Sequence, residues 1–330
     1  MLVFINRIDR ILDDYIEYGC LFMFLITILG PTAIGKTKIA VQLAAQLNGE
    51  IISADSRQVY RGLDIGSGKD LAEYSFNGKV IPYHLIDILE AGEQYDLFQF
   101  QQDFYTAYNG ILERGHQAIL CGGSGLYLEA ALARKQLLEV PENSSLRNAL
   151  KSHTQQQLNA YLNELKPHLH NTTDLTDRKR TIRAIELATA EKMQQSPSSP
   201  VAYGPIFGLK MDREQLYARI EIRLEQRLNE GLIEEVEGLL QKGLSHEDLQ
   251  YYGLEYKYLS MHLKEELNRT QLIQQLGQAI RKFAKRQMTW FRRMEKRGTK
   301  ITWINANQSS SATANEIVGQ LKYTKPDGQL

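Results

Sequence analysis

The residues from 30 to 37 carry the clearest chemistry in the sequence. They match G-x-x-x-x-G-K-T and are Gly30, Pro31, Thr32, Ala33, Ile34, Gly35, Lys36 and Thr37. In this pattern the glycines let backbone N–H groups converge on phosphate oxygens, at a helix start that favours anions. Lys36 would reach the outer phosphates, and the Thr37 hydroxyl would bind Mg²⁺. The segment therefore predicts a site for a di- or triphosphate group.

Hydrophobic patterns on both sides of this loop supply the context that the motif needs. An apolar run at 25–29 predicts a buried strand, and residues 39–47 repeat apolar side chains at helical spacing. Strand, glycine loop and helix follow one another in the order that a P-loop requires. The alternative, a glycine turn that only joins a strand to a helix, does not account for the complete motif.

Two polar side chains follow further predicted strands. Asp55 comes directly after the apolar segment 50–54, and Ser124 follows the segment 117–121 in a second glycine-rich junction. In an open parallel sheet, ligand groups gather beyond the carboxyl ends of the strands, so both residues are candidates for one crevice. Asp55 would lie next to the P-loop if its strand neighbours the strand at 25–29. A turn or helix-capping role is its alternative.

A carboxylate is missing where an ATP-hydrolysing P-loop enzyme usually carries its Mg²⁺ ligand, at the end of a second buried strand. The segment 117–121 runs into glycine, and Asp87 lies inside the strand-like segment 80–89 rather than at its end. The residues thus favour polyphosphate binding over water activation. They indicate group transfer, in which Lys36, Mg²⁺ and arginines hold a diphosphate leaving group while Asp55 deprotonates the nucleophile.

Arginines recur along the helix predicted to start near residue 212. Arg213 and Arg219 lie six residues apart, and Arg223 and Arg227 continue at four-residue steps among several glutamates. For Arg223 and Arg227 we expect mainly a ladder of ion pairs within the helix.

The helix predicted over 270–298 is strongly basic. The segment contains many Lys and Arg residues but a single acidic residue, Glu295. Trp290 and Phe291 lie among the basic residues. On a chain whose formal net charge is zero, this clustering predicts a surface for a polyanion. A calmodulin-binding or membrane-surface helix would need a continuous apolar face, and the strand predicted at 300–304 ties this helix to the core instead.

Strands and helices alternate up to about residue 140, which predicts an α/β fold with a doubly wound parallel sheet. We expect a P-loop NTPase-like core over 23–140 and 201–305, a helical insertion over 141–200, a dispensable extension over 1–22 and a flexible tail over 306–330. The basic run 177–186 within the insertion is either a binding surface or simply a solvated helix face.

The composition of the 330-residue chain is that of a globular protein, with 43% hydrophobic and 24% charged residues. Cys20 and Cys121 are its only cysteines, which argues against a disulfide scaffold or a zinc site. The apolar run 21–29 is too short to span a bilayer, and the acidic residues before it do not fit a signal peptide. We expect a cytoplasmic monomer with no membrane association.

The chain resembles the tRNA dimethylallyltransferase (tRNA isopentenyltransferase) family from residue 25 to about 305. The matching stretches are GPTAIGKT at 30–37, ADSRQVYRGLDIG at 54–66, YHLIDI at 83–88, GGSGLY at 122–127, RKRTIRAIE at 178–186, YYGLEY at 251–256 and FAKRQMTWFRR at 283–293. The P-loop alone is common to many activities. The combination of DSRQVY, GGSGLY and AKRQMTWFR is specific to this family.

The resemblance implies transfer of a dimethylallyl group from dimethylallyl diphosphate to N6 of adenosine 37, in tRNAs that read codons beginning with U. It implies that Asp55 is the general base and that Mg²⁺ binds at Thr37. It also places residues 32–37 on the diphosphate, with Arg213 and Arg219 reaching it from the opposite side.

The same resemblance implies that the partner is the anticodon stem-loop of tRNA. Asp55, Ser56, Arg57 and Gln58 would hold the flipped-out adenosine, together with Ser124, whose hydroxyl replaces the family's usual threonine. Contacts to the anticodon stem would come from Arg147, Lys179, Arg180, Thr181, Ile182 and Arg183, and the basic helix would add Arg286 and Arg293.

The loop 66–69 reads Gly-Ser-Gly-Lys and differs from the commoner IGTAK form of the family. A C-terminal Cys/His zinc module, seen in some eukaryotic relatives, does not occur, which fits the bacterial type. Two other classes stay open: a small-molecule kinase with Asp55 as base, and a non-catalytic RNA-binding protein. The missing strand-end carboxylate argues against the first class, and Asp55 together with Lys36 argues against the second. Whether ATP also occupies the P-loop stays open as well.

Overall fold

The computed structural model describes residues 24–133, 135–167, 175–193 and 204–321, so the expected extension 1–22 lies outside it. The chain forms two compact units, each of which we describe by itself. The larger unit contains the described residues up to 95, residues 102–132 and those from 204 onward. The smaller unit contains residues 96–101 and the described residues from 133 to 193.

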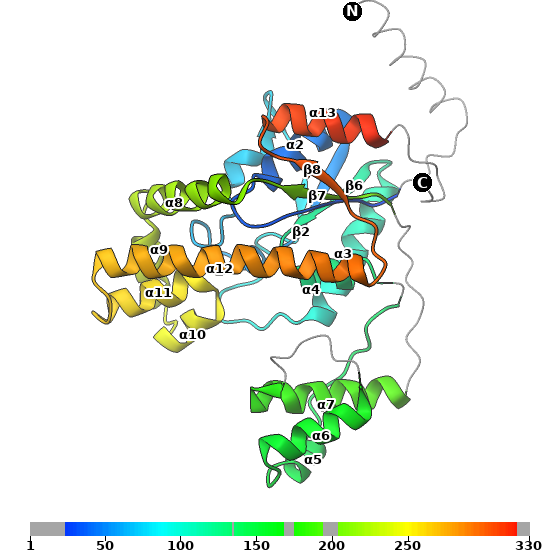
Figure 1. The fold of residues 1–330 in the computed structure, drawn as a ribbon, viewed down its shortest axis with the longest axis vertical. Helices are drawn as coiled ribbons and strands as arrows, with labels where there is room; N and C mark the ends of the chain where they lie inside the picture. The colour runs from blue at the N-terminus through cyan, green and yellow to red at the C-terminus, as the bar shows by residue number, and fades with distance from the viewer. Residues whose placement is uncertain (1–23, 134, 168–174, 194–203, 322–330) are drawn as a thin grey trace, which may run out of the picture. The chain divides into compact units, whose positions relative to one another are not determined.

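A six-stranded parallel sheet forms the centre of the larger unit (Figure 1). The strand order is β5 (Tyr83–His84), β2 (Gly49–Ala54), β6 (Gln117–Gly122), β1 (Ile26–Leu29), β7 (Ile206–Lys210) and β8 (Thr302–Asn305). Strands β1 and β2 are buried along their whole length, as parallel strands covered on both faces are. The predicted parallel α/β class is thereby confirmed.

The strand predicted over 80–89 is mostly wrong. Only β5 joins the sheet there, and β4 (Lys79–Val80) instead pairs antiparallel with β3 (Ser75–Phe76). Leu85 and Asp87 have positive φ angles of 62° and 55°, which break an extended backbone. An apolar composition therefore signalled burial at this segment and not a continuous strand.

The larger unit also contains several helices. They are α2 (Lys36–Leu47), α3 (Leu97–Glu113, whose first residues cluster with the smaller unit), α4 (Gly125–Ala131), α8 (Arg213–Asn229), α9 (Leu232–Gln241), α10 (His246–Tyr251), α11 (Leu254–Leu263), α12 (Arg269–Lys296) and α13 (Ser310–Leu321), with a short 3₁₀ turn at Leu71–Tyr74. Helix α2 packs on β1, β2 and β6, and α12 packs against α4, α8 and α11. Within the described residues, no helix combines the length and the apolar character needed to cross a membrane.

The tail predicted to be flexible from residue 306 is instead helical over α13. Ala314 and Ile317 are fully buried in the contact of α13 with α2. The Gln42 amide of α2 donates a hydrogen bond to the Ser310 hydroxyl at 3.0 Å. The few apolar residues of α13 are separated by polar ones, so its buried stripe is visible only when the residues are placed on a helix.

The smaller unit is helical in its described part, with α5 (Ser144–Ala149), α6 (Gln155–Leu165) and α7 (Arg178–Met193). Its core consists of Leu150, Leu158, Leu162, Ile185 and Ala188. Thr154 begins α6 with a capping box, in which its side chain and that of Gln157 exchange hydrogen bonds with the backbone.

Glu50 forms a buried charge cluster near the start of β2. Arg114 donates to both carboxylate oxygens at 2.8 and 2.7 Å, and ring nitrogens of His84 and His116 lie 2.6 Å from them. The hydrogen bonds from Arg114 are the largest influence, and with those from the two histidines they lower the pKa of Glu50 to about 2. The cluster therefore links β2 to β5 and to the end of α3 through a carboxylate that stays charged.

We predict that Glu50→Gln lowers the free energy of unfolding by roughly 3 kcal/mol at pH 7, from about 1.4 kcal/mol per pKa unit. Because the folded-state pKa lies below the unfolded-state value, this stabilisation is present above pH 4.5 and is lost as the pH falls towards 2. The difference between the two proteins in urea unfolding should shrink by about half at pH 3. A difference that does not change with pH would contradict the assignment.

Candidate active site

The loop at 30–37 connects β1 to α2 and has the backbone of a phosphate-binding loop. Ala33 and Gly35 have positive φ angles of 62° and 92°, and Lys36 is the first residue of α2. Lys36 Nζ donates a hydrogen bond to the Pro31 carbonyl oxygen at 2.9 Å, so the ammonium group folds back over the loop. A cation and a helix N-terminus thus meet at one place, which suits an anion.

Burial is the main influence on the charge of Lys36. Burial, with a smaller contribution from the positive charge of Arg223, lowers the pKa of the ammonium group to about 8. The negative charge of Asp55 acts in the opposite direction. An anion bound to the loop would add to this effect and hold Lys36 in its charged form.

Asp55 reaches the site although its strand does not neighbour β1. Strand β6 lies between β1 and β2, so the condition under which the sequence placed Asp55 next to the P-loop is not met. Gly122 at the end of β6 allows a close approach to β2, because a Cβ there would lie 2.3 Å from the Ala54 carbonyl oxygen. Just beyond, the Ser124 hydroxyl accepts a hydrogen bond from the Ser56 N–H at 3.4 Å. The loops that carry Asp55 and Ser124 therefore meet.

Asp55 forms the turn that the sequence left open as its alternative role. Its Oδ1 accepts the N–H of Arg57 at 2.9 Å. A carboxylate offers several acceptor positions, so this bond orients Asp55 without using up its capacity to accept a proton. The loop of Ser124, which meets the Asp55 loop, also lies beside Lys36, since a Cβ built on Gly123 would be 3.5 Å from Lys36 Nζ.

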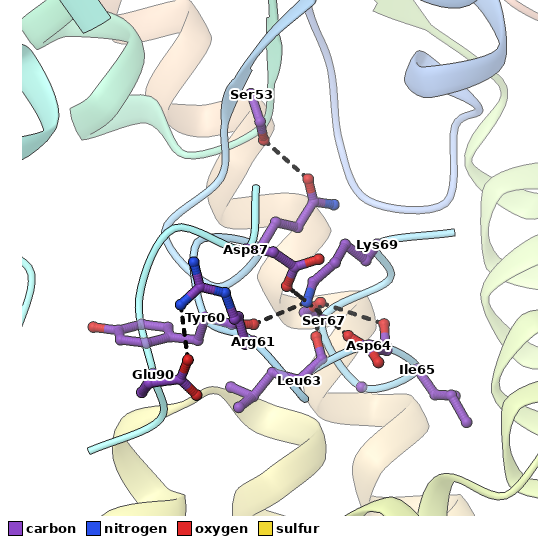
Figure 2. A network of polar contacts seen from close by, with 12 residues as sticks. Ser53, Tyr60, Arg61, Leu63, Asp64, Ile65, Ser67, Lys69, Asp87 and Glu90 are labelled. Atoms are coloured by element: carbon purple, nitrogen blue, oxygen red, sulfur yellow. Dashed lines mark hydrogen bonds and ion pairs between the residues drawn. The ribbon is translucent and has the colours of Figure 1, made fainter. Parts of the chain in front are cut away.

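A buried lysine organises the segment that follows Asp55 (Figure 2). Lys69 is 1% exposed, and its Nζ donates to the Tyr60 carbonyl at 2.8 Å, to Asp64 at 2.7 Å and to Asp87. Gln58 accepts from the Ser53 hydroxyl at 2.9 Å, and its amide donates to the Gly68 carbonyl at 3.1 Å. The DSRQ residues thus belong to a fixed loop.

Glu235 of α9 holds the same loop from the other side. Its carboxylate accepts the backbone N–H groups of Asp64, Ile65 and Gly66 at 2.6 to 3.0 Å, and the Tyr256 hydroxyl at 2.7 Å. This role of Glu235 has no local signal in the sequence, because one glutamate among many on a helix does not reveal its partners.

Three arginines of α8, Arg219, Arg223 and Arg227, lie beside the P-loop or its adjoining cavity, and the ladder of ion pairs expected within the helix for Arg223 and Arg227 is wrong. Arg219 donates to the Ile34 carbonyl at 3.4 Å. Arg223 pairs with Asp70 at 3.0 Å, outside its own helix. Arg227 is 8% exposed and lies 3.9 Å from Asp70. A step of four residues places all three on one side of α8.

A cavity adjoins the first half of the P-loop. It is lined by Thr32, Ala33, Ile220, Arg223, Leu224, Arg227, Glu255 and Ile280. The guanidinium groups of Arg223 and Arg227 pack directly on Gly68. A Cβ at position 68 would lie 2.0 Å from Arg227 and 2.4 Å from Arg223, so only glycine leaves room for them. Arg213 is placed differently: it is exposed, and its Nε donates to the Tyr217 hydroxyl at 3.1 Å. The structure therefore brings Arg219 to the P-loop as expected, adds Arg223, and does not bring Arg213.

The outer face of α12 is basic, as predicted. Its exposed cations are Lys282, Lys285, Arg286, Arg292, Arg293 and Lys296. The guanidinium carbons of Arg286 and Arg293 lie 5.7 and 5.9 Å from the rings of Phe283 and Trp290. This face offers charge and aromatic surface to a polyanion.

The smaller unit presents only part of its predicted binding set to solvent. Arg147 pairs with the buried Glu186 at 2.7 Å, and Arg183 pairs with it at 3.1 Å. Thr181 is fully buried, and Ile182 packs on the core of this unit. Lys179 and Arg180 are exposed. The Arg147 and Arg183 side chains are each 33% exposed while paired, and Thr181 is buried. Lys179 and Arg180 are the solvent-facing candidates for a contact with nucleic acid.

The residues present fit an Mg²⁺ ion that is bound mainly through a substrate. Mg²⁺ prefers oxygen ligands and is usually held by one or two protein groups with phosphates and water. The Thr37 hydroxyl lies in the first turn of α2, beside Lys36. In the described part of the chain, no three His, Cys, Asp or Glu side chains cluster in a way that could hold a metal ion.

The fold and the site define a P-loop α/β protein equipped to bind a polyphosphate beside a carboxylate. Family models agree with this class: the model described as IPP transferase matches residues 58–294, and the model described as isopentenyl transferase matches residues 23–79. The chain therefore belongs to the tRNA dimethylallyltransferase (IPP transferase) family, and the resemblance seen in the sequence motifs is confirmed.

Individual relatives match over nearly their whole length. The chain is 48% identical to tRNA dimethylallyltransferase 1 of Geotalea uraniireducens over 89% of this chain and 96% of that one. It is 51% identical to tRNA dimethylallyltransferase 1 of Parabacteroides distasonis over 86% and 92%. The crystal structure of the tRNA isopentenylpyrophosphate transferase of Bacillus halodurans is similar with a TM-score of 0.65 at 34% identity, covering 91% of this chain and 97% of that one.

We predict that diphosphate binding near pH 8 takes up about half a proton through Lys36, because a bound anion raises a pKa that lies close to the pH. Calorimetry in buffers of different ionisation enthalpy measures this uptake. Lys36→Arg is the matched control, since its guanidinium stays charged in both states and the uptake through residue 36 should disappear. Equal uptake by both proteins would contradict the prediction.

We predict that Arg223→Ala raises the Kd for diphosphate by about 10- to 100-fold, because it removes a charge-assisted contact at the P-loop cavity. Arg213→Ala, a change of the same kind on the same helix, should leave the Kd within about twofold, since its side chain lies in solvent. Titration with Mg²⁺ present measures both constants. A larger increase in Kd for Arg213→Ala than for Arg223→Ala would show that Arg213, and not Arg223, binds the diphosphate.

Proposed function

We propose that this protein transfers a dimethylallyl group from dimethylallyl diphosphate to N6 of adenosine 37, in tRNAs that read codons beginning with U. The products are N6-(dimethylallyl)adenosine and diphosphate. The observation that carries the proposal is that the loops of Asp55 and Ser124 meet beside Lys36, in a P-loop fold whose strand β6 ends in glycine instead of a carboxylate. The names of the relatives contain the dimethylallyl group and tRNA, and the sequence resemblance implies the diphosphate donor and the position of the acceptor.

In the proposed reaction, the N6 lone pair attacks C1 of the allyl group, and the bond from C1 to the diphosphate oxygen breaks. Diphosphate leaves with that electron pair, and Asp55 accepts the proton from N6. Lys36, Arg219 and Arg223 stabilise the negative charge that develops on the leaving group. Ser124 and the segment Ser56–Gln58 would hold the adenosine after it leaves the base stack.

We further propose Mg²⁺ as the cofactor, held by the Thr37 hydroxyl together with diphosphate oxygens. When bound, the ion neutralises charge on the diphosphate and so assists its departure. The tRNA would bind on the basic face of α12 and on Lys179 and Arg180 of the smaller unit. A tRNA substrate supports a cytoplasmic enzyme of the bacterial type, and we propose that it acts as a monomer.

The proposal is tested with purified protein, Mg²⁺, labelled dimethylallyl diphosphate and an unmodified tRNA with adenosines at 36, 37 and 38. Label should appear in this tRNA and not in a tRNA that carries guanosine at position 37. Absence of transfer, with ATP hydrolysed or a small molecule phosphorylated instead, would replace the proposal with a P-loop kinase.

We predict that Asp55→Asn lowers kcat by at least about 100-fold, because an amide cannot accept the proton from N6. The affinity for tRNA should stay within about threefold, since the amide still accepts the Arg57 N–H that forms the turn. Single-turnover transfer and filter binding measure the two effects separately. A kcat near that of the wild type would remove Asp55 from the base role.

A further inference from the structure

Gln287 lies on the inner face of α12 and joins two loops of the site. It is 7% exposed. Its Oε1 accepts the backbone N–H of Thr32 at 2.8 Å, and its Nε2 donates to the Gly123 carbonyl at 2.9 Å. One amide thus bonds the P-loop through its acceptor end and the loop that carries Ser124 through its donor end. No hydrocarbon or carboxylate side chain can make both bonds.

Gln287 also lies close to the partly buried cation of the P-loop. A Cβ built on Gly123 would be 2.4 Å from Gln287 Nε2, 3.1 Å from the Gly30 carbonyl oxygen and 3.5 Å from Lys36 Nζ. Only a residue without a side chain fits between these groups. A displacement of Gln287 would therefore change the surroundings of Lys36 as well as the hydrogen bond to Thr32.

The rest of α12 is fixed to the same side of the site. Trp290 Nε1 donates to Glu129 of α4 at 3.1 Å, and its indole packs so closely on Gly125 that a Cβ there would lie 2.3 Å from the ring. The next residue, Phe291, and Met294 one turn further along are buried. The opposite face of α12 carries the exposed cations described above. One face of α12 therefore carries exposed cations, and the other face is hydrogen-bonded to the loops of Thr32 and Gly123.

We infer that Gln287 is a positioning residue that couples tRNA binding on α12 to diphosphate binding in the P-loop. A shift of α12 on binding a polyanion moves Thr32 N–H and Gly123 together, since both are bonded to one side chain. By linkage, diphosphate in the P-loop must then change the affinity for tRNA by the same factor. This inference rests on the proposed function, because it takes tRNA as the ligand of the basic face.

The coupling is measured as the ratio of tRNA Kd values with and without inorganic diphosphate and Mg²⁺. We expect a ratio of at least about fivefold in the wild type, at the low end of typical couplings between two sites. Gln287→Met keeps the length of the side chain and removes both hydrogen bonds, so the ratio should fall to within about twofold of unity. Gln278→Met is the matched control, because Gln278 is exposed on the same helix, and its ratio should equal that of the wild type.

Gln287→Glu separates a positioning role from a purely structural one. Its carboxylate can still accept the Thr32 N–H, but it cannot donate to Gly123 and it brings a negative charge next to Lys36. The KM for dimethylallyl diphosphate should rise at least about tenfold, and it should rise more than in Gln287→Met, because the new charge competes with diphosphate for Lys36. A purely structural role predicts the same KM in both variants at equal thermal stability. Gly123→Ala displaces the Gln287 amide while residue 287 stays glutamine, and it should reduce the coupling ratio in the same way. This variant replaces Gln287→Met in the test if the Met variant does not fold.

A coupling ratio in a folded Gln287→Met protein equal to that of the wild type would overturn the inference, as would a wild-type ratio of one. Both results can occur while the wild type still transfers the dimethylallyl group to adenosine 37, so they leave the proposed function standing. A wild type that neither binds tRNA nor modifies it overturns the proposed function, and the inference falls with it.

Discussion

The partial dehydration of one cation is the constraint on which the site depends. Lys36 is partly buried at the start of α2, and the loss of hydration is the main cause that lowers its pKa to about 8. The Pro31 carbonyl and the charge of Asp55 compensate only in part. A diphosphate supplies the missing negative charge, whereas a neutral ligand of the same size would leave Lys36 as unstable as before. The P-loop therefore favours anions, because the positive charge of Lys36 is only partly balanced by the protein itself.

The same reasoning applies to the cavity next to the loop. Burial and the neighbouring Arg223 lower the pKa of Arg227, while burial raises the pKa of Glu255 on the opposite side. Asp70 lies between the two arginines and offsets part of their repulsion. Two guanidinium groups and two carboxylates are therefore held close together beside the P-loop, at an electrostatic cost. Stability is thus sacrificed locally for binding, as is common at functional sites.

The sequence predicted those features that depend on local pattern. The P-loop, the strands at 50–54 and 117–121 and the basic helix all follow from spacing within one segment. Features set by distant partners were missed or misassigned. Arg223 looked like part of a ladder because its glutamate neighbours are close in sequence, whereas Asp70 lies 153 positions away. Gln287 and Glu235 likewise act through contacts that no periodicity reports, and the insertion of β6 between β1 and β2 is a property of the whole sheet.

The sequence distance that Gln287 spans bears on how the protein is made. Its bond to Thr32 joins residues 255 positions apart, and β8, which follows α12, completes the edge of the sheet beside β7. Ribosomal synthesis delivers the P-loop and the Asp55 loop early and α12 near the end of the chain. A nascent chain that has reached the smaller unit holds the phosphate-binding motif but not the helices that complete its surroundings. Incomplete chains therefore cannot assemble the catalytic arrangement, and activity begins only when nearly all of the protein has left the ribosome.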